Sequence, residues 1–273
     1  MWQAGWWTTG RDRAALDLFR AVRSAMADGT IPGAFGYLFC SREAGESAPS
    51  DAVIREAEAA GVPVVTCSAA RFRPELRAAD REAWRTAYHR EVLARLSGFT
   101  ADLVVLAGYM WVVSAEVCRS LPVINLHPAA PGGPAGTWQE VIWQLLEAGA
   151  AETGVMMHLV TPELDQGPPV TFCRFPITGG AWDALWTAYR DKRRSADLSE
   201  IQASQGEAEP LFAAVRREGV RRELPLIVQT LRAFAAGEVA LAGGRLVDAA
   251  GRPLDGPRDL TGPIEEMLAG GAG

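Results

Sequence analysis

The chain has 273 residues, 48% of them hydrophobic, which is enough to bury the core of one large domain or two small ones. Its formal net charge is -6, so we expect no nucleic-acid partner held by general electrostatics. The N-terminal residues do not show the leader pattern, in which a basic stretch is followed by an apolar one. The chain also has no apolar run of the roughly 18 residues that a membrane-spanning helix needs. We therefore expect no membrane partner and a cytoplasmic location.

The first half alternates short apolar runs with longer periodic ones. Runs rich in β-branched or aromatic residues, typical of buried strands, cover 33–40, 62–67 and 102–110. Helix-like repeats at three and four positions cover 15–27, 50–61 and 79–96. This alternation predicts an α/β fold with a mostly parallel central sheet flanked by helices. Residues 2–7 are either an opening strand or a loop that packs its tryptophans onto the core.

The second half begins with a helix at Thr137, where Thr137 and Glu140 have capping-box spacing. Two strands are predicted at 153–161 and 169–177, and residues 183–210 form an expected exposed helix and linker. A long helical region follows over 207–236, with Pro225 as a point of kinking. A small hairpin then covers 238–248, with Gly243 and Gly244 at its turn.

Cysteines stand at positions 40, 67, 118 and 173, and none belongs to a CxxC pair, so neither a disulfide framework nor a zinc site is expected. They are interpreted as buried thiols of a reducing compartment. The sequence has no HExxH or three-histidine spacing, and no metal is expected.

Asn125 and His127 are the first candidates for chemistry. They lie two residues apart in the strand-like run INLHP, so their side chains point to one face, and Pro128 places that face at the carboxyl end of the strand. Parallel α/β sheets bind ligands at this edge. An amide donor beside an imidazole suits an oxyanion on a carbonyl carbon. Hydrogen bonding that merely ends the strand is the alternative reading of the spacing.

A carboxylate would complete such a site, and Asp165 in the loop TPELDQGPP is the preferred candidate, with Glu163 as its competitor. His158 stands alone in an apolar strand, where a histidine is more often a satisfied core residue than a catalyst. His89 lies in a helix among charged residues, and we expect it at the surface.

The turn Thr9–Arg13 joins the first predicted strand to the first helix. Free N–H groups at a helix start favour an anion, and Gly10 supplies the turn. An ordinary turn with Asp12 as the helix cap is an equally good reading.

Three segments in this order, DLVVLAGYMWVVS, INLHP and ETGVMMHLVTPELDQGPPV, carry a family resemblance that extends through LPLIVQTLRAFAAGEVAL. The sequence resembles the folate-dependent formyltransferases, and among them the family that formylates glycinamide ribonucleotide in purine biosynthesis. The resemblance implies a Rossmann-like formyltransferase fold with a long C-terminal helix and a small hairpin. It also implies transfer of a formyl group from 10-formyltetrahydrofolate, the co-substrate, to a primary amine.

Residue by residue, the resemblance implies that Asn125 and His127 hold the tetrahedral oxyanion. Asp165 would fix His127 and accept the amine proton through water, and His158 would support the site. The pterin would lie against the backbone of 106–113, and the loop 160–165 would close its other side. The cofactor-binding residues implied in this way are Leu106, Met110, Trp111, Val112, Val113, Val160 and Asp165, and the acceptor-binding residues are Gly10, Arg11, Asp12, Arg13, Gly108 and Pro128.

Three departures from the family pattern lie where the amine would bind: GRDR at 10–13, the loop after His127, and the stretch 183–210. The acceptor is therefore glycinamide ribonucleotide or a related phosphorylated or acidic amine. The alternatives are a 10-formyltetrahydrofolate deformylase, an amino-sugar formyltransferase and a non-catalytic folate-binding protein.

We expect a formyltransferase core at 1–180 and a charged insertion at 181–210. A helix and hairpin at 211–250 would pack on the core, and 251–273, which is rich in glycine and proline, would be a loosely ordered tail. The expected partners are folate and a small-molecule amine. The sequence does not fix the oligomeric state, and a homodimer is one option.

Overall fold

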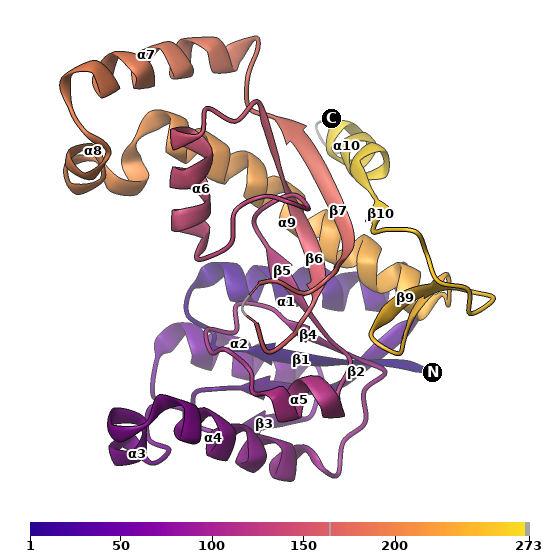
Figure 1. Cartoon of the computed structure of the whole chain (residues 1–273). Helices are drawn as coiled ribbons and strands as arrows, with labels where there is room; N and C mark the ends of the chain where they lie inside the picture. Colours follow the sequence, from indigo (N-terminus) through magenta and orange to yellow (C-terminus); the bar gives the residue numbers. More distant parts are fainter. Residues whose placement is uncertain (164, 271–273) are drawn as a thin grey trace. The chain divides into compact units, whose positions relative to one another are not determined.

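Strands and helices alternate along the chain in the computed structural model, which describes residues 1–163 and 165–270 (Figure 1). The strands are β1 (Trp2–Thr8), β2 (Gly33–Cys40), β3 (Val64–Thr66), β4 (Leu103–Leu106), β5 (Val123–His127), β6 (Glu152–Leu159), β7 (Pro169–Pro176), β8 (Val239–Ala242), β9 (Arg245–Asp248) and β10 (Arg258–Asp259). The helices are α1 (Arg13–Ala27), α2 (Ala48–Ala59), α3 (Pro74–Ala79), α4 (Arg81–Leu96), α5 (Ala115–Ser120), α6 (Trp138–Glu147), α7 (Ala181–Ser195), α8 (Leu198–Ser204), the 3-10 turn η1 (Gly206–Ala208), α9 (Pro210–Ala235) and α10 (Thr261–Gly270).

Within the described residues, one eight-stranded sheet has the strand order β10-β7-β6-β5-β4-β1-β2-β3. The pairs β1–β2, β1–β4, β2–β3 and β4–β5 are parallel, as is β10–β7. Strands β8 and β9 form a separate antiparallel pair whose turn contains Gly243 and Gly244, as predicted. The predicted α/β class, with a mostly parallel sheet, a long C-terminal helix and a small hairpin, is therefore confirmed.

The chain folds into two compact units. The first unit consists of residues 1–126, 158–168 and 227–256. The second unit consists of residues 127–157, 169–226 and the segment from Pro257 on. Most of the predicted site residues lie in the first unit.

Strand β1 is the central strand of the first unit, and the side chains of its two adjacent tryptophans point to opposite faces of the sheet. Trp6 packs edge-on against Phe19 of α1, with ring centroids 6.0 Å apart, whereas Trp7 packs against Phe39 at 5.0 Å. Both tryptophans are fully buried, as the alternation of a strand between two helical layers requires. Of the two readings of residues 2–7, the strand is correct.

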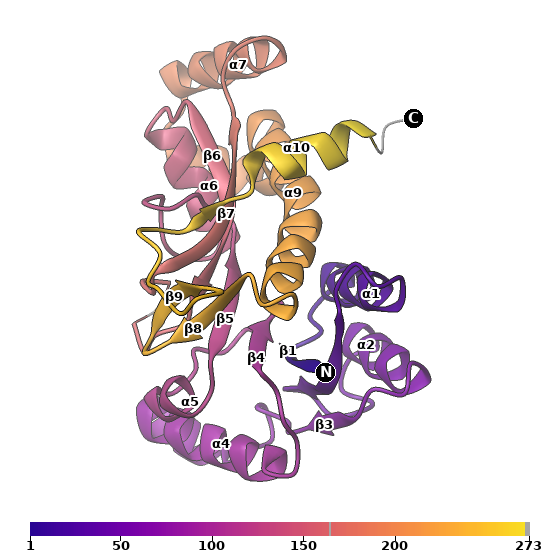
Figure 2. The ribbon, with the colours of Figure 1, turned by 90° about the vertical axis from the view of Figure 1, so that its right-hand side faces the viewer.

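The helices of the first unit form two layers over these faces. Figure 2 shows α1 and α2 on one side of the strands and α4 and α5 on the other. Side chains from α4 and α5, among them Trp84, Tyr88 and Val117, join Trp7 in one buried apolar cluster. This cluster lies directly beneath the loop that follows β4.

His89 of α4 belongs to this buried layer, so its predicted surface position is wrong. The side chain is fully buried and its ring stacks on Trp7, with centroids 6.4 Å apart. Its neighbours at spacings of three and seven, Val92 and Leu96, are buried as well, because all three residues lie on the apolar stripe of the helix.

The second unit has its own apolar core, to which the stretch 181–210 contributes. Trp186 and Tyr189 of α7 and Ile201 of α8 are almost fully buried there. Trp143 of α6 packs against Phe212 of α9, with ring centroids 4.7 Å apart. The stretch was expected to be an exposed helix and linker; instead, its apolar side chains anchor two helices.

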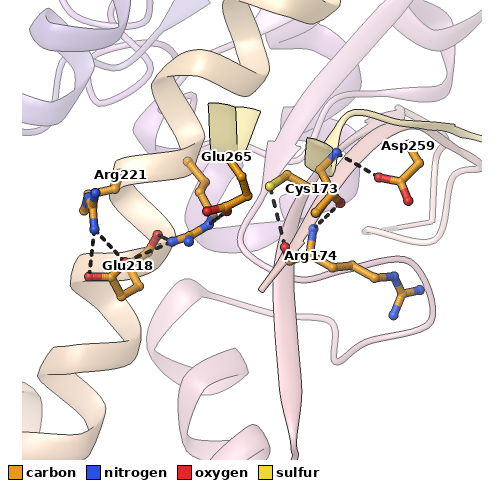
Figure 3. Close-up of polar contacts among 8 residues, drawn as sticks. Cys173, Arg174, Glu218, Arg221, Asp259 and Glu265 are labelled. Atoms are coloured by element: carbon orange, nitrogen blue, oxygen red, sulfur yellow. Dashed lines mark hydrogen bonds and ion pairs between the residues drawn. The ribbon is translucent and has the colours of Figure 1, made fainter. Parts of the chain in front are cut away.

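The described part of the C-terminal segment is also packed, although a loosely ordered tail was expected over 251–273. Strand β10 pairs with β7, and Leu260 and Ile264 are buried. Arg222 Nε lies 2.6 Å from Glu265 Oε1, and the backbone N–H of Arg174 donates to Thr261 Oγ1 at 3.0 Å (Figure 3). Residues 271–273 of the predicted tail lie outside the described residues.

Candidate active site

Asn125, the middle residue of β5, meets His158, which lies one residue before the end of the neighbouring strand β6. Asn125 Nδ2 lies 3.2 Å from His158 Nε2, and His158 is 2% exposed. The two residues are 33 positions apart in sequence, and both belong to the first unit. The histidine that the sequence indicated as a core or supporting residue is thus a direct partner of the predicted catalytic amide.

The second ring nitrogen of His158 fixes the direction of this hydrogen bond. His158 Nδ1 lies 3.1 Å from the carbonyl oxygen of Leu159, which can only accept. Nδ1 therefore carries the hydrogen, and Nε2 of the neutral ring is an acceptor. It follows that Asn125 presents its NH2 group, rather than its oxygen, to His158. The amide has two hydrogens, and one of them remains for a ligand.

Asp165 lies beside the same imidazole. Its Oδ1 is 3.7 Å from His158 Nε2, and its side chain is only 10% exposed. The backbone of Asp165 has φ 54, a left-handed conformation that aspartate and asparagine tolerate better than most residues. Glu163, its competitor in the sequence, is exposed. Burial and position both favour Asp165 as the carboxylate of the site.

Gly167 closes the base of the loop that carries Asp165. A Cβ atom at this position would lie 1.6 Å from the carbonyl oxygen of Leu159, so no other residue fits without moving the backbone. The N–H of Leu159 donates to the carbonyl of Pro168 at 2.9 Å. The glycine thus allows the loop to return to the strand end from which it left. Leu164 lies outside the described residues.

His127 belongs to the second unit, where it is 2% exposed. Its Nε2 lies 2.9 Å from the carbonyl oxygen of Pro134, in the loop that runs from Pro128 to Thr137. A carbonyl only accepts, so Nε2 carries a hydrogen and donates it to this loop. Pro128 is half-buried directly after the strand. The predicted meeting of His127 with Asn125 and Asp165 stays a prediction.

The segment assigned to the pterin, 106–113, begins where β4 ends. Strand β4 ends at Leu106, four residues before the predicted boundary at 110. Gly108 follows with φ 67, a left-handed conformation that does not continue a strand. Along the segment, Leu106, Tyr109 and Val113 are buried, whereas 49% of Met110 is exposed. The exposed methionine and backbone thus lie on a rigid apolar base, the cluster around Trp7.

Two buried polar atoms of this region have no hydrogen-bond partner among the described residues. They are Trp111 Nε1 and Ser114 Oγ, and the Ser114 residue is only 3% exposed. A buried donor without a partner costs about 1–3 kcal/mol. A water or ligand atom that reached these two groups would recover this energy.

Thr9 ties this segment to the first strand-to-helix turn. Its N–H donates to the carbonyl of Gly108 at 3.1 Å, and its Oγ1 accepts from the N–H of Met110 at 3.0 Å. The same hydroxyl lies 2.9 Å from Ser41 Oγ, at the end of β2. One threonine therefore connects the ends of three strands, a role that sequence spacing could not indicate.

At the first turn, the structure confirms that Asp12 caps α1. Its carboxylate accepts from the N–H groups of Ala14 and Ala15 at 3.0 and 3.4 Å. Those groups are therefore already occupied by a negative charge. Arg11 and Arg13 are exposed, and Arg42 Nη1 lies 3.3 Å from the carbonyl oxygen of Gly10. An anion at this turn would have to pair with the arginines rather than with the helix start.

Among the described residues, no group of three or more His, Cys, Asp or Glu side chains could hold a metal ion. Cys40, Cys67 and Cys173 are buried free thiols, and burial raises the pKa of each to about 11. Such thiols stay protonated at neutral pH and make poor nucleophiles.

No helix in the described part of the chain is long and apolar enough to cross a membrane.

Comparison with curated proteins finds relatives over part of the chain. The phosphoribosylglycinamide formyltransferase of Escherichia coli strain K12 is 34% identical over 98 residues, which are 35% of this chain and 45% of that enzyme. The phosphoribosylglycinamide formyltransferase of Schizosaccharomyces pombe is 30% identical over 131 residues, or 45% of this chain and 62% of that enzyme. The chain thus spans less than two thirds of the length of either relative.

Solved structures match over most of the chain. Glycinamide ribonucleotide transformylase 1 from Symbiobacterium toebii aligns with a TM-score of 0.62 and 23% identity, over 93% of this chain and 95% of that one. A formyltetrahydrofolate deformylase from Pseudomonas syringae aligns with a TM-score of 0.59 and 18% identity, over 90% of this chain and 65% of that one. At these identities the likeness shows a shared fold.

The family model described as formyl transferase matches residues 46–185, more than half of the chain. The matched range contains the segment 106–113 and the residues Asn125, His158 and Asp165. The chain belongs to the formyl transferase family.

Proposed function

We propose that this protein transfers a formyl group from 10-formyltetrahydrofolate to a primary amine, with glycinamide ribonucleotide or a related phosphorylated amine as the acceptor. The observation that carries the proposal is the cluster of Asn125, His158 and Asp165, in which Asn125 lies opposite Leu106, the last residue of β4. The names of the relatives support the same activity.

The residues present fit a reduced folate. The segment 106–113 offers backbone groups and two unpaired buried polar atoms nearby, and the apolar cluster beneath it supplies a firm base. A flat heterocycle needs this combination of polar edge contacts and apolar faces. When bound, 10-formyltetrahydrofolate would supply the formyl carbon at which the amine nitrogen forms its new bond and from which N10 departs.

Asn125 would stabilise the negative charge that develops on the formyl oxygen. Its NH2 group has one hydrogen directed to His158 and a second to donate to that oxygen. Because His158 fixes which end of the amide points inward, it acts as a positioning residue. Removal of one such donor typically costs about 100-fold to 1,000-fold in rate.

Asp165 would take the proton that the attacking amine must lose, either directly or through water. The left-handed backbone at Asp165 holds the carboxylate at the end of a loop whose base is fixed by Gly167.

His127 would act as the second donor to the oxyanion only after its Nε2 is released from the Pro134 carbonyl. Movement of the loop Pro128–Thr137 would provide that release. Acceptor binding is a suitable trigger, because this loop is one of the segments that depart from the family pattern.

Arg11 and Arg13 would pair with the phosphate or carboxylate of the acceptor, since both side chains are exposed, and Arg13 would exchange its contact with Asp17 Oδ1 at 3.1 Å for the acceptor. Arg42, held near Gly10, would add a third positive charge at the same turn. This arrangement favours an acidic amine over a neutral one.

Incubation with 10-formyltetrahydrofolate and a panel of primary amines, including glycinamide ribonucleotide, tests the proposal. We expect tetrahydrofolate release that requires an amine, together with a product heavier by one formyl group. Release at the same rate without any amine would indicate a deformylase instead. Binding of folate with no release under any condition would indicate a non-catalytic folate-binding protein.

A further inference from the structure

The imidazole of His89 is hydrogen-bonded to Tyr109, inside the segment assigned to the pterin. His89 Nε2 lies 3.1 Å from the Tyr109 hydroxyl, and His89 Nδ1 lies 2.9 Å from the carbonyl oxygen of Arg85. His89 is fully buried and Tyr109 is 9% exposed. This contact joins helix α4 to the loop after β4 within the first unit.

The partners of His89 determine the direction of the bond. The Arg85 carbonyl can only accept, so Nδ1 carries the hydrogen. Burial lowers the pKa of His89 to about 4, so the ring is neutral at physiological pH. Nε2 is then an acceptor, and the Tyr109 hydroxyl must be the donor.

Aromatic rings pack against His89 and Tyr109 from several sides. The ring of Tyr109 is edge-on to Trp7, with centroids 5.5 Å apart, and lies 6.2 Å from Phe39. His89 in turn stacks on Trp7 and meets Tyr88 edge-on at 5.3 Å. Tyr109 therefore has one orientation, because its ring is enclosed and its hydroxyl has a fixed partner.

The residues on either side of Tyr109 are exposed. Gly108 and Met110 both reach solvent, and Gly108 has a left-handed backbone. A backbone that turns at a glycine between exposed residues would be free to move without an anchor. At this turn, Thr9 holds the backbone of Gly108 and Met110, and Tyr109 adds a second anchor because its large side chain enters the core.

We infer that His89 and Tyr109 are positioning residues for folate: their hydrogen bond holds the backbone of 107–113 in the conformation that receives the pterin. This inference deepens the proposed function and rests on it. Neither side chain touches the reacting atoms, so the effect is expected on folate affinity rather than on the chemical step.

Tyr109→Phe removes the donor and keeps the ring. Tyr37→Phe is the matched control, because Tyr37 is also buried in the Trp7 cluster and its hydroxyl accepts from Trp7 Nε1 at 3.1 Å. Tyr109→Phe loses the hydrogen bond to His89 and the contact with the Tyr88 hydroxyl, and Tyr37→Phe loses the hydrogen bond from Trp7, so both variants are expected to lose thermal stability. Of the two tyrosines, only Tyr109 lies in the folate segment.

The first readout needs no folate. Amide hydrogen exchange of peptides covering 107–113 is measured in the ligand-free protein. We expect exchange to be about tenfold faster in Tyr109→Phe, because about one hydrogen bond no longer opposes local opening, and unchanged in Tyr37→Phe. Equal exchange in the two variants would overturn the positioning role, whatever the protein does with folate.

The second readout is the affinity for 5-formyltetrahydrofolate, a stable analogue, together with KM and kcat for 10-formyltetrahydrofolate. We expect Tyr109→Phe to weaken binding and to raise KM by about tenfold, with kcat little changed. His89→Gln, whose amide oxygen can accept from Tyr109, should retain more affinity than His89→Leu. Equal affinity in all variants would refute the inference. Failure of the wild-type protein to bind any folate would instead refute the proposed function, and the inference with it.

Discussion

The NH2 group of Asn125 donates to Nε2 of His158 at 3.2 Å, between the neighbouring strands β5 and β6. Through this contact the imidazole orients the amide, and the amide keeps a second hydrogen for the substrate. Both residues therefore contribute to one feature of the site, the position of a single donor.

Because both residues position the same donor, the effects of their substitution should not be additive. Asn125→Ala, His158→Ala and the double variant are compared with wild type for the rate of formyl transfer. We expect the double variant to be about as slow as Asn125→Ala, with a coupling free energy of about 0.5–3 kcal/mol. Rate losses that simply multiply would show that the two side chains act independently.

Asp165 and Glu163 lie in one loop, but replacing each carboxylate by an amide should have different effects on the rate of formyl transfer. Asp165→Asn keeps the shape of the side chain and tolerates the left-handed backbone, so the fold should be preserved. We expect formyl transfer to fall about 100-fold or more, because the proton acceptor is lost. Glu163→Gln should remain within about twofold of wild type, since Glu163 is exposed. A larger loss of rate in Glu163→Gln than in Asp165→Asn would show that Glu163 is the catalytic carboxylate.

The exposed arginines of the first turn should affect the acceptor and not the folate. Arg11→Ala combined with Arg13→Ala removes two positive charges near Gly10. We expect KM for a phosphorylated amine to rise about tenfold or more, since charge-assisted hydrogen bonds contribute about 1.5–3 kcal/mol each. Arg20→Ala serves as the control, because Arg20 lies on α1 away from the turn and, like Arg13 with Asp17, has a carboxylate partner, Glu56. An unchanged KM in the double variant would place the acceptor anion elsewhere.

The buried imidazole of His89 should make the fold sensitive to acid. Burial lowers its pKa from 6.5 to about 4, so below pH 6.5 the unfolded chain takes up a proton that the folded chain does not. Stability is therefore lost as the pH falls from about 6.5 to about 4, by about 3 kcal/mol in total, and this effect stops below the folded pKa.

Urea unfolding of wild type and His89→Gln between pH 7.5 and 4 measures this effect. Other titratable groups are the same in both proteins, so the difference in slope belongs to His89. We expect wild type to lose more stability than the variant over this range. Parallel curves would mean that the imidazole is protonated in the folded protein.

The sequence predicted those parts of the molecule that local periodicity determines. The alternating strand faces, the capping box at Thr137 and the glycine turn of the hairpin each depend on residues a few positions apart, and each was found. His89 could have been placed correctly from the same kind of evidence, because it shares an apolar stripe with Val92 and Leu96. The charges of its sequence neighbours suggested the surface instead.

Contacts over long sequence separations were beyond such reasoning. Asn125 and His158 meet because β5 and β6 are neighbours in the sheet, and no spacing within either strand reveals their register. Thr9 and Met110, 101 positions apart, are a similar case. The C-terminal segment was expected to be loose because glycine and proline dominate it, yet a few buried side chains such as Leu260 and Ile264 suffice to dock it.

The most direct test of formyl transfer at this site is kcat of Asn125→Ala, measured beside its affinity for 5-formyltetrahydrofolate. We predict a fall in kcat of at least about 100-fold with folate affinity within about twofold of wild type, because the amide stabilises charge that exists only during the reaction. Wild-type kcat in a variant that binds folate normally would contradict the assignment of the active site.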